Sequence, residues 1–170
     1  MNIREQILTE HSKENAEAIA DWIGTDKSRL KKLIDIFLYD EYRVVQWAAF
    51  VISRVADKHH DLLTPHLDSM VARMKEPNLH VAVKRNVLRI LQDRQIPEHL
   101  HGDIMNLCFD SLANVQEPIA VRVFSMTVLD NLSKQYPEIK QELHAIIEEE
   151  LQRGASAGFT SRAKKILKRR

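Results

Sequence analysis

The chain has 170 residues, of which 44% are hydrophobic, 29% charged and 6% aromatic, with four glycines and five prolines. This length suits one globular domain, and the scarcity of glycine and aromatic residues argues against β-sandwiches and barrels, which need many tight turns and aromatic-rich strands. No apolar run approaches the ~18 residues that a membrane-spanning helix requires. The composition therefore predicts an all-α domain without a transmembrane segment.

The formal net charge of +1 conceals an uneven distribution along the chain. No acidic residue follows Glu150, whereas residues 153–170 carry seven basic side chains. Subtracting these seven from the 25 basic residues leaves 18 against 24 acidic residues, so the preceding part has a formal charge of about −6. Nucleic acid is bound through clusters of Lys and Arg, and this distribution argues against a surface that is basic throughout.

The first predicted helix begins after Ser12 and ends at Gly24, because serine is a favoured N-cap and glycine a favoured C-terminal stop. We expect residues 1–25 to form a helical cap in front of the remaining chain. The start of the sequence does not resemble a signal peptide, and the single Cys108 rules out an internal disulfide or a Cys-based zinc site. These features predict a cytoplasmic location.

Beyond residue 25, apolar residues recur in four segments with the same spacing, at positions 0, 4, 7 and 8. Such a set lies on one face of a helix. The four sets are Leu30, Ile34, Phe37 and Leu38; Leu63, Leu67, Met70 and Val71; Leu100, Ile104, Leu107 and Cys108; and Ile139, Leu143, Ile146 and Ile147. They predict the first helices of four repeats, with prolines such as Pro65 in a first helical turn.

A second motif, a small or branched residue followed by a polar one, alternates with these apolar sets. It occurs at Val45-Gln46, Val83-Lys84, Val121-Arg122 and Ser161-Arg162, at intervals of 38, 38 and 40 residues. Each occurrence predicts the second helix of a repeat. Together the two series predict helical-hairpin repeats over residues 26–158, followed by a basic capping helix over residues 159–170.

The segments 83–91 and 121–129, each with a Val-basic pair followed by a ladder of branched residues and leucine, resemble HEAT repeats and their armadillo relatives. The resemblance covers residues 26–170. It implies a single domain with an α-α superhelix, a HEAT-like solenoid of about four helical-hairpin repeats, as in small bacterial HEAT-like proteins. It also implies an adaptor, and a basic repeat position (Lys84, Arg122 and Arg162) that bonds neighbouring repeats.

Common catalytic and cofactor motifs are missing from the sequence, including Gly-x-Gly-x-x-Gly, the Walker loop, Gly-x-Ser-x-Gly and His-Glu-x-x-His. The pair His99 and His101 has a spacing that points the rings apart on a helix, so we expect exposed or capping histidines rather than metal ligands. Cys108 lies on an apolar stripe and is expected to be a buried thiol. We therefore predict no catalytic residue, no cofactor and no metal ion, and favour a non-enzymatic protein.

The outward side of the second helices is the predicted binding ridge, because second helices normally line the concave face of a solenoid. The candidate ridge residues are Trp47, Arg54, Arg85 and Arg89. An indole beside guanidinium groups can bind a carboxylate-bearing peptide or a phosphate backbone. The alternative is that Trp47 packs between the first two repeats while the arginines pair with Asp40, Asp57 or Asp93.

The basic C-terminal helix is a second candidate surface. Its basic residues are Arg162, Lys164, Lys165, Lys168, Arg169 and Arg170. These side chains could contact nucleic acid or an anionic membrane. Alternatively the helix is a structural cap that closes the last repeat through the apolar residues Phe159, Ala163, Ile166 and Leu167.

Together these patterns favour a scaffold or adaptor that binds another protein or peptide. One alternative is a nucleic-acid-binding solenoid resembling the HEAT-like alkylpurine DNA glycosylases, with Trp47, Arg85, Arg89 and the basic tail on the phosphate backbone. Another is a helical regulatory subunit, or one associated with an enzyme such as a lyase. Nothing in the sequence points to a particular oligomeric state.

Overall fold

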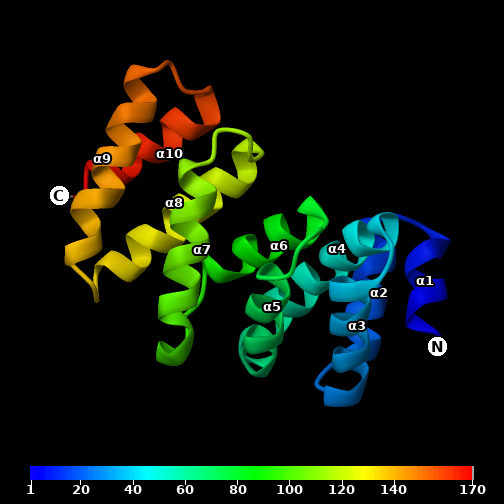
Figure 1. Cartoon of the computed structure of the whole chain (residues 1–170). Helices are drawn as coiled ribbons and strands as arrows, with labels where there is room; N and C mark the ends of the chain where they lie inside the picture. The colour runs from blue at the N-terminus through cyan, green and yellow to red at the C-terminus, as the bar shows by residue number, and fades with distance from the viewer. Residues whose placement is uncertain (170) are drawn as a thin grey trace. The chain divides into compact units, whose positions relative to one another are not determined.

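The fold is entirely helical in residues 1–169, the part of the chain that the computed structural model describes. These residues form ten α-helices and two short 3-10 helices, without a strand (Figure 1). No helix within them is both long enough and apolar enough to cross a lipid bilayer. The predicted all-α class is confirmed.

The α-helices follow one another in five pairs. These are α1 (Ile3–Thr9) and α2 (Lys13–Ile23), α3 (Lys27–Tyr39) and α4 (Tyr42–Lys58), α5 (Leu67–Met74) and α6 (Val81–Leu91), α7 (His101–Ala113) and α8 (Ile119–Ser133), and α9 (Glu138–Gln152) and α10 (Ala157–Leu167). The 3-10 helices η1 (His60–His66) and η2 (Glu98–Leu100) precede α5 and α7. Residues 1–25, expected to be a helical cap, thus hold the predicted helix α2 and a further helix, α1.

Local sequence signals explain where these helices begin and end. The Ser12 hydroxyl accepts a hydrogen bond from the Asn15 amide at the start of α2, and Gly24 ends the same helix with φ of +52°, a conformation that favours glycine. Pro65 differs from its prediction, because it lies inside η1 rather than in the first turn of an α-helix. The helix expected from Leu63 therefore becomes α-helical only at Leu67.

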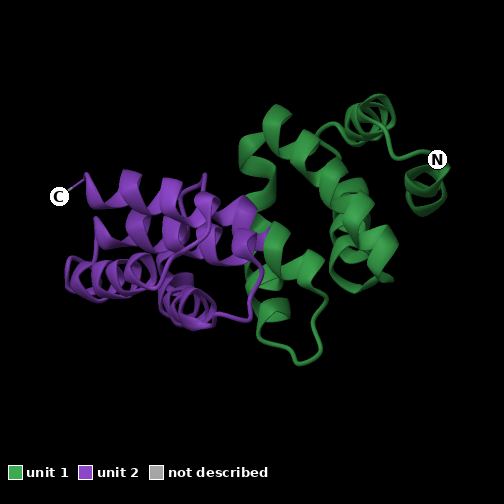
Figure 2. Ribbon diagram, turned by 90° about the horizontal axis from the view of Figure 1, so that it is seen from above, with its two compact units in different colours: residues 1–86 green, residues 87–170 purple. Residues whose placement is uncertain are grey.

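The residues form two compact units, 1–86 and 87–170, whose boundary falls within α6 (Figure 2). In unit 1, α1 packs against α3 and α2 packs against α4. In unit 2, α7 packs against α9 and α8 packs against α10. First helices thus stack on first helices and second on second, which is the repeat arrangement that the sequence predicts.

The predicted apolar sets form much of the core. All members of the two sets that begin at Leu30 and Leu63 are buried. In the later sets, Leu107, Ile139 and Ile146 are only half-buried. Two of these three lie on α9, which packs against α7, α8 and α10.

The second helices keep a strict 38-residue interval to the end of the chain. Val45, Val83 and Val121 are fully buried, and so is Phe159, which follows Val121 by 38 residues. Ser161 is exposed, so the prediction that Ser161-Arg162 continues the series was wrong. An aromatic residue fills the buried position in the last repeat, and Arg162 consequently does not occupy the position of Arg122.

Arg122 confirms the expectation that the basic repeat position joins neighbouring helices. Its side chain is 6% exposed, and its Nε donates a hydrogen bond of 2.9 Å to the carbonyl oxygen of Leu112 on α7. Its Nη2 lies 2.9 Å from the Glu150 carboxylate on α9, as an ion pair without hydrogen-bond alignment. The guanidinium carbon is 5.0 Å from the ring centroid of Phe159 on α10. One side chain thus links four helices of unit 2.

Candidate functional site

One face of α4 carries a row of cationic and aromatic side chains, which we name the α4 stripe: Arg43, Trp47, Phe50 and Arg54. Their spacing of four, three and four residues places them on the same side of the helix. The opposite side of α4 is buried in unit 1. The stripe is therefore an outward-facing feature of a second helix, as expected for Trp47 and Arg54.

Cations and rings alternate along the α4 stripe. The Arg43 guanidinium lies 4.6 Å from the ring centroid of Trp47, and the Arg54 guanidinium lies 5.2 Å from that of Phe50. The exposed His11, in the connection between α1 and α2, stacks on Trp47 at 4.9 Å and lies 5.6 Å from Phe50. Trp47 and Phe50 are both half-buried, so part of each residue is exposed to solvent.

The space beside these rings is too small for a small-molecule ligand. The hollow bounded by His11, Trp47 and Phe50 has a volume of about 10 Å³, which is room for about one water molecule. Pockets that bind small ligands usually measure at least ~300 Å³. The α4 stripe is consequently suited to contact with a macromolecule.

The two arginines of the stripe differ in their ion pairing. The Arg54 guanidinium lies 3.6 Å from the Asp57 carboxylate, a pairing that the sequence allowed as an alternative to ligand binding. Arg43 is exposed, and no carboxylate within residues 1–169 lies at salt-bridge distance from it. Arg43 thus holds the less compensated positive charge.

The predicted ridge is only partly brought together. Trp47 and Arg54 share the α4 stripe, but the ring partners of Trp47 are Arg43 and His11, while Arg54 lies over Phe50. Arg85 is half-buried and Arg89 exposed, one turn apart on α6. Sequence analysis missed Arg43, His11 and Phe50, although the spacing of Arg43, Trp47, Phe50 and Arg54 is visible in the sequence.

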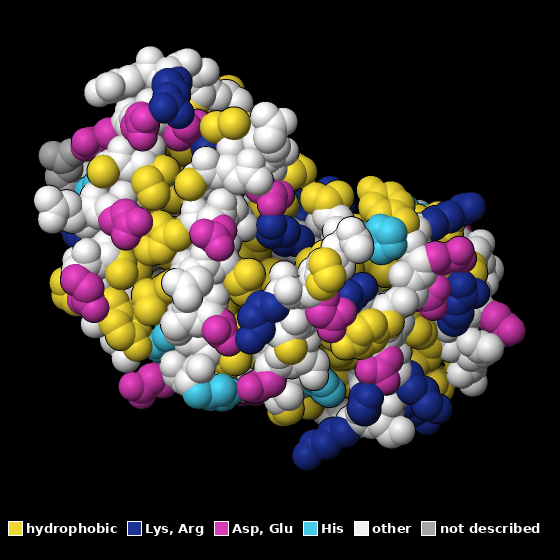
Figure 3. Space-filling view, in the orientation of Figure 1, with side chains coloured by type: hydrophobic (Ala, Val, Ile, Leu, Met, Phe, Trp, Pro, Cys, Tyr) yellow, Lys and Arg dark blue, Asp and Glu magenta, His cyan; other side chains and the backbone are white. Residues whose placement is uncertain are grey.

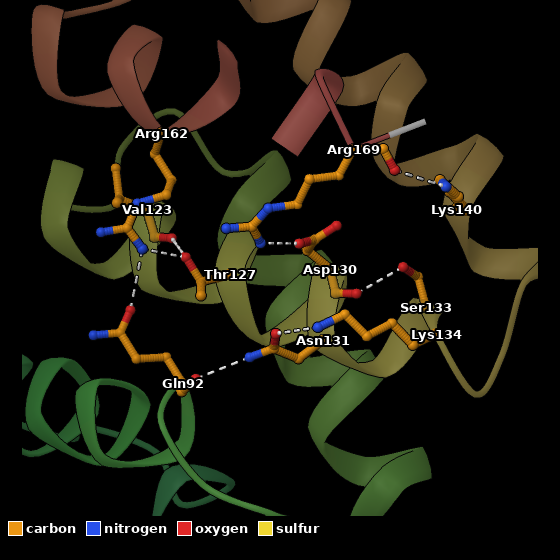
Figure 4. Close-up of polar contacts among 10 residues, drawn as sticks. All are labelled: Gln92, Val123, Thr127, Asp130, Asn131, Ser133, Lys134, Lys140, Arg162 and Arg169. Carbon is orange, nitrogen blue, oxygen red and sulfur yellow. Dashed lines mark hydrogen bonds and ion pairs between the residues drawn. The ribbon is translucent and has the colours of Figure 1, made fainter. Parts of the chain in front are cut away.

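A second candidate site lies in unit 2, where α10 passes over α8 (Figure 4). It is a polar cleft of about 290 Å³, which we name the α8–α10 cleft. The cleft is lined by Gln92, Asp93, Thr127, Asn131, Arg162, Lys165, Ile166 and Arg169. Three of these, Arg162, Lys165 and Arg169, come from the predicted basic end.

Arg162 on α10 and Arg169, just after the end of this helix, extend toward α8 (Figure 4). Arg162 donates hydrogen bonds to the Thr127 hydroxyl and, at 3.4 Å, to the side-chain oxygen of Gln92. Arg169 forms an ion pair of 2.9 Å with Asp130, whose side chain is 6% exposed. The two arginines therefore differ: one has a carboxylate partner, and the other is held by neutral oxygen atoms.

The other side chains of the basic C-terminal segment are partly buried in the core and partly exposed to solvent. Phe159, Ala163 and Ile166 are buried where α10 packs against α8 and α9, and Leu167 is half-buried. Lys164 and Lys168 are exposed on the outer side of α10. Arg170 lies outside the described residues.

The histidine expectation was wrong for His101. This residue is 5% exposed, with Nε2 at 2.8 Å from the carbonyl oxygen of Ile96 and Nδ1 at 2.9 Å from the Tyr136 hydroxyl. A carbonyl can only accept, so Nε2 donates to Ile96, while the Tyr136 hydroxyl, which can donate or accept, is the partner of Nδ1. Cys108 is buried as predicted. Residues 1–169 contain no cluster of three or more His, Cys, Asp or Glu side chains arranged to hold a metal ion.

Comparison with known proteins identifies the architecture as a whole. A family model described as a HEAT repeat domain matches residues 3–170. Neither the curated proteins nor the solved structures gave a match. The matched region begins at α1, so the first helix pair is included with the four predicted repeats. With its stacked helix pairs and this match over nearly its full length, the chain belongs to the HEAT repeat domain family.

Proposed function

We propose that the chain is a non-enzymatic protein-binding module whose α4 stripe holds an acidic peptide segment of a partner protein. HEAT repeats often serve protein interaction, which supports the general class. The observation that carries the specific proposal is the half-buried Trp47, whose ring contacts both the exposed Arg43 and the stacked His11. Tryptophan and arginine are the residue types most enriched at the energetic centres of protein interfaces.

The stripe offers two kinds of contact at once. The exposed parts of Trp47 and Phe50 can bury apolar side chains of the partner. The flanking guanidinium groups can form charge-assisted hydrogen bonds with carboxylates. We expect Arg43 rather than Arg54 to bind such a carboxylate, because Arg54 already pairs with Asp57.

The length of the stripe sets the spacing of the acidic groups in the peptide. Arg43 and Arg54 are eleven residues apart on one helix, which at ~1.5 Å per residue separates their Cα atoms by about 16 Å. An extended peptide rises ~3.3 Å per residue. Two carboxylates about five residues apart, with apolar residues between them, would therefore match the stripe.

Charge near the stripe favours a peptide over nucleic acid. Glu10 borders the hollow beside Trp47, and Asp57 lies next to Arg54. On the face of the described chain shown in Figure 3, acidic and basic side chains are interspersed. A polyanionic backbone would meet these carboxylates, whereas a peptide with two acidic groups can avoid them.

Fluorescence anisotropy with labelled peptides tests the proposal. The peptides carry two glutamates separated by three to seven positions, with leucine or tryptophan between them. We expect the tightest binding near a separation of five, and at least tenfold weaker binding by Trp47→Ala, because loss of a hot-spot ring costs about 1.4 kcal/mol or more. Arg43→Glu should weaken binding further by repelling the peptide.

Trp22→Ala is the matched control, because Trp22 is also a half-buried indole in unit 1 with a guanidinium, that of Arg29, over its ring. It lies off the stripe and should leave peptide affinity unchanged, while circular dichroism checks folding of every variant. If Trp47→Ala and the native chain bound the peptide with equal affinity, the α4 stripe would not be the peptide-binding site. Steeply salt-dependent binding of single-stranded DNA, with no peptide bound, would favour the nucleic-acid alternative instead.

A further inference from the structure

We infer that the α8–α10 cleft of unit 2 is a binding site for a single carboxylate group, presented either by a peptide C-terminus or by a small free acid. The inference concerns a different unit and different residues from the α4 stripe. Its outcome is therefore independent of the function proposed above. It rests on the contacts of Arg162, on the fixed groups beneath it and on the charge of the cleft.

Arg162 is the first reason to expect an anion in this cleft. The half-buried Arg162 donates to the Thr127 hydroxyl and the Gln92 side-chain oxygen, which are both uncharged. Among residues 1–169, no carboxylate lies at salt-bridge distance from Arg162 or Lys165. In the same unit, Arg122 and Arg169 each have a carboxylate at 2.9 Å. A guanidinium has five N–H donors, so Arg162 keeps donors for a ligand.

The groups beneath Arg162 are held in place before any ligand arrives. Thr127 donates its hydroxyl proton to the carbonyl oxygen of Val123 at 3.2 Å, which leaves a lone pair for Arg162 (Figure 4). Asn131 donates from its side-chain nitrogen to the carbonyl oxygen of Gln92 at 2.8 Å. These bonds hold the Thr127 hydroxyl and the backbone of Gln92, and both residues in turn accept from Arg162. A guanidinium held in place before binding loses less entropy when a ligand arrives.

Two cations of the cleft lie on one side of α10. Arg162 and Lys165 are three residues apart on this helix, which places them on the same side, whereas Arg169 follows the end of α10 at Leu167. Lys165 is exposed at the cleft. A ligand bound to Arg162 would therefore meet a second cation one helical turn further on.

The charge of the cleft selects a monoanion. Arg169 is neutralised by Asp130, and the exposed Asp93 offsets one of the two remaining cations, Arg162 and Lys165. One net positive charge remains. A carboxylate, with one negative charge and two oxygens that match the guanidinium fork, fits this balance. A phosphate dianion would bring an additional negative charge toward Asp93.

Two-dimensional NMR titration provides the test, with N-acetyl-trialanine as free acid, the same peptide amidated at its C-terminus, propionate and inorganic phosphate as probes. We expect saturable shifts of the Thr127, Asn131 and Arg162 amides with the free-acid peptide and no saturable shift with the amidated peptide. Tighter binding of the peptide than of propionate would assign a peptide terminus as the source. Equal binding would assign the carboxylate group alone, as a free acid presents it.

Three charge-removing variants distinguish carboxylate binding in the cleft from nonspecific electrostatic attraction to the basic helix. Arg162→Gln should weaken free-acid binding at least tenfold. Lys165→Gln, at an exposed position where folding is not at stake, should weaken it several-fold. Lys164→Gln removes the same charge from the outer side of α10 and should leave the affinity unchanged. The inference is overturned by absent carboxylate binding, by tighter binding of phosphate, or by an equal effect of Lys164→Gln and Arg162→Gln.

Discussion

At the scale of single residues, the two arginines that the sequence placed at equivalent positions have different environments. Arg122 is enclosed by a backbone carbonyl, a carboxylate and the Phe159 ring. Arg162 faces a cleft and is held by two neutral oxygens. The same residue type therefore joins stacked helices in one case and, in the other, belongs to the cleft that we propose as a binding site. The difference follows from the two-residue shift of register in the last repeat.

Arg122 is expected to be the most sensitive polar residue of unit 2. Replacing it by methionine, Arg122→Met, leaves the 12% exposed Glu150 with only Arg153, at 3.4 Å, as a described ion-pair partner. Loss of one partner of a buried pair costs about 3–5 kcal/mol. We expect a decrease of that order in the free energy of unfolding, measured by urea denaturation.

The double variant Arg122→Met with Glu150→Gln tests the source of that loss. Once the carboxylate is replaced by a neutral amide, no unpaired charge remains near the core. The double variant should therefore lose clearly less stability than the sum of the two single variants. Additive losses would instead assign the effect to the Leu112 hydrogen bond and to packing on Phe159.

At the scale of helices, periodicity predicted most of the fold because core burial follows the 3.6-residue repeat. All members of the set from Leu30 to Leu38 are buried, as are all members of the set from Leu63 to Val71. The 3-10 start at His60 was missed because apolar spacing does not distinguish it from an α-helical turn. The register of α10 was missed because Ser161-Arg162 mimics the motif that ends at Arg122.

The candidate sites were less predictable than the helices. Trp47 and Arg54 could be named from the sequence because their positions follow from helix periodicity, and Arg162 and Arg169 because they belong to the basic C-terminal segment. His11 could not, because its stacking on Trp47 joins the connection before α2 to α4, and such a contact has no periodic signal. Thr127 and Asn131 likewise could not be named, because their contacts with Arg162 and Gln92 join segments that are distant in the sequence.

The attachment of α1 supplies a pH-dependent contribution to stability. Arg4 on α1 donates two hydrogen bonds, of 2.8 and 3.0 Å, to the Asp40 carboxylate at the end of α3. These bonds lower the pKa of Asp40 below its ordinary value. The folded state therefore binds the proton less readily than the unfolded state. The stabilisation is present above the ordinary pKa of about 4 and is lost as the pH falls through the lowered pKa.

Asp40→Asn should accordingly lower the urea midpoint at pH 7. The difference from the native chain should shrink as the pH falls from about 5 to about 2, because both proteins then lack the carboxylate charge. Arg4→Gln should reproduce the loss at pH 7. A difference that stays constant over this pH range would show that the Asp40 charge does not stabilise the fold.

At the scale of the whole molecule, stacked repeats predict that stability is local. Each helix pair in a repeat protein mainly contacts its neighbours, so a local substitution affects nearby repeats most. The two compact units, 1–86 and 87–170, fit this expectation, because most contacts close within each unit. The two candidate sites lie in different units, with the α4 stripe in unit 1 and the α8–α10 cleft in unit 2.

Phe159→Ala tests this locality in the whole chain. Phe159 is fully buried in α10, and replacing a buried phenylalanine by alanine costs about 3–5 kcal/mol. It also removes the ring beneath Arg122. Hydrogen exchange followed by mass spectrometry should show faster exchange in α8, α9 and α10, with α1, α2 and α3 retaining native protection.

Ser161→Ala is the control for this experiment, because Ser161 is exposed on the same helix and its replacement should leave exchange throughout the chain unchanged. If Phe159→Ala accelerated exchange equally in α1, α2 and α3, the chain would unfold as one cooperative body. If instead the faster exchange is confined to α8, α9 and α10, a further expectation follows for peptide binding. The α4 stripe would then keep its peptide affinity in Phe159→Ala, because its supporting contacts to α2 and α3 lie in the protected unit.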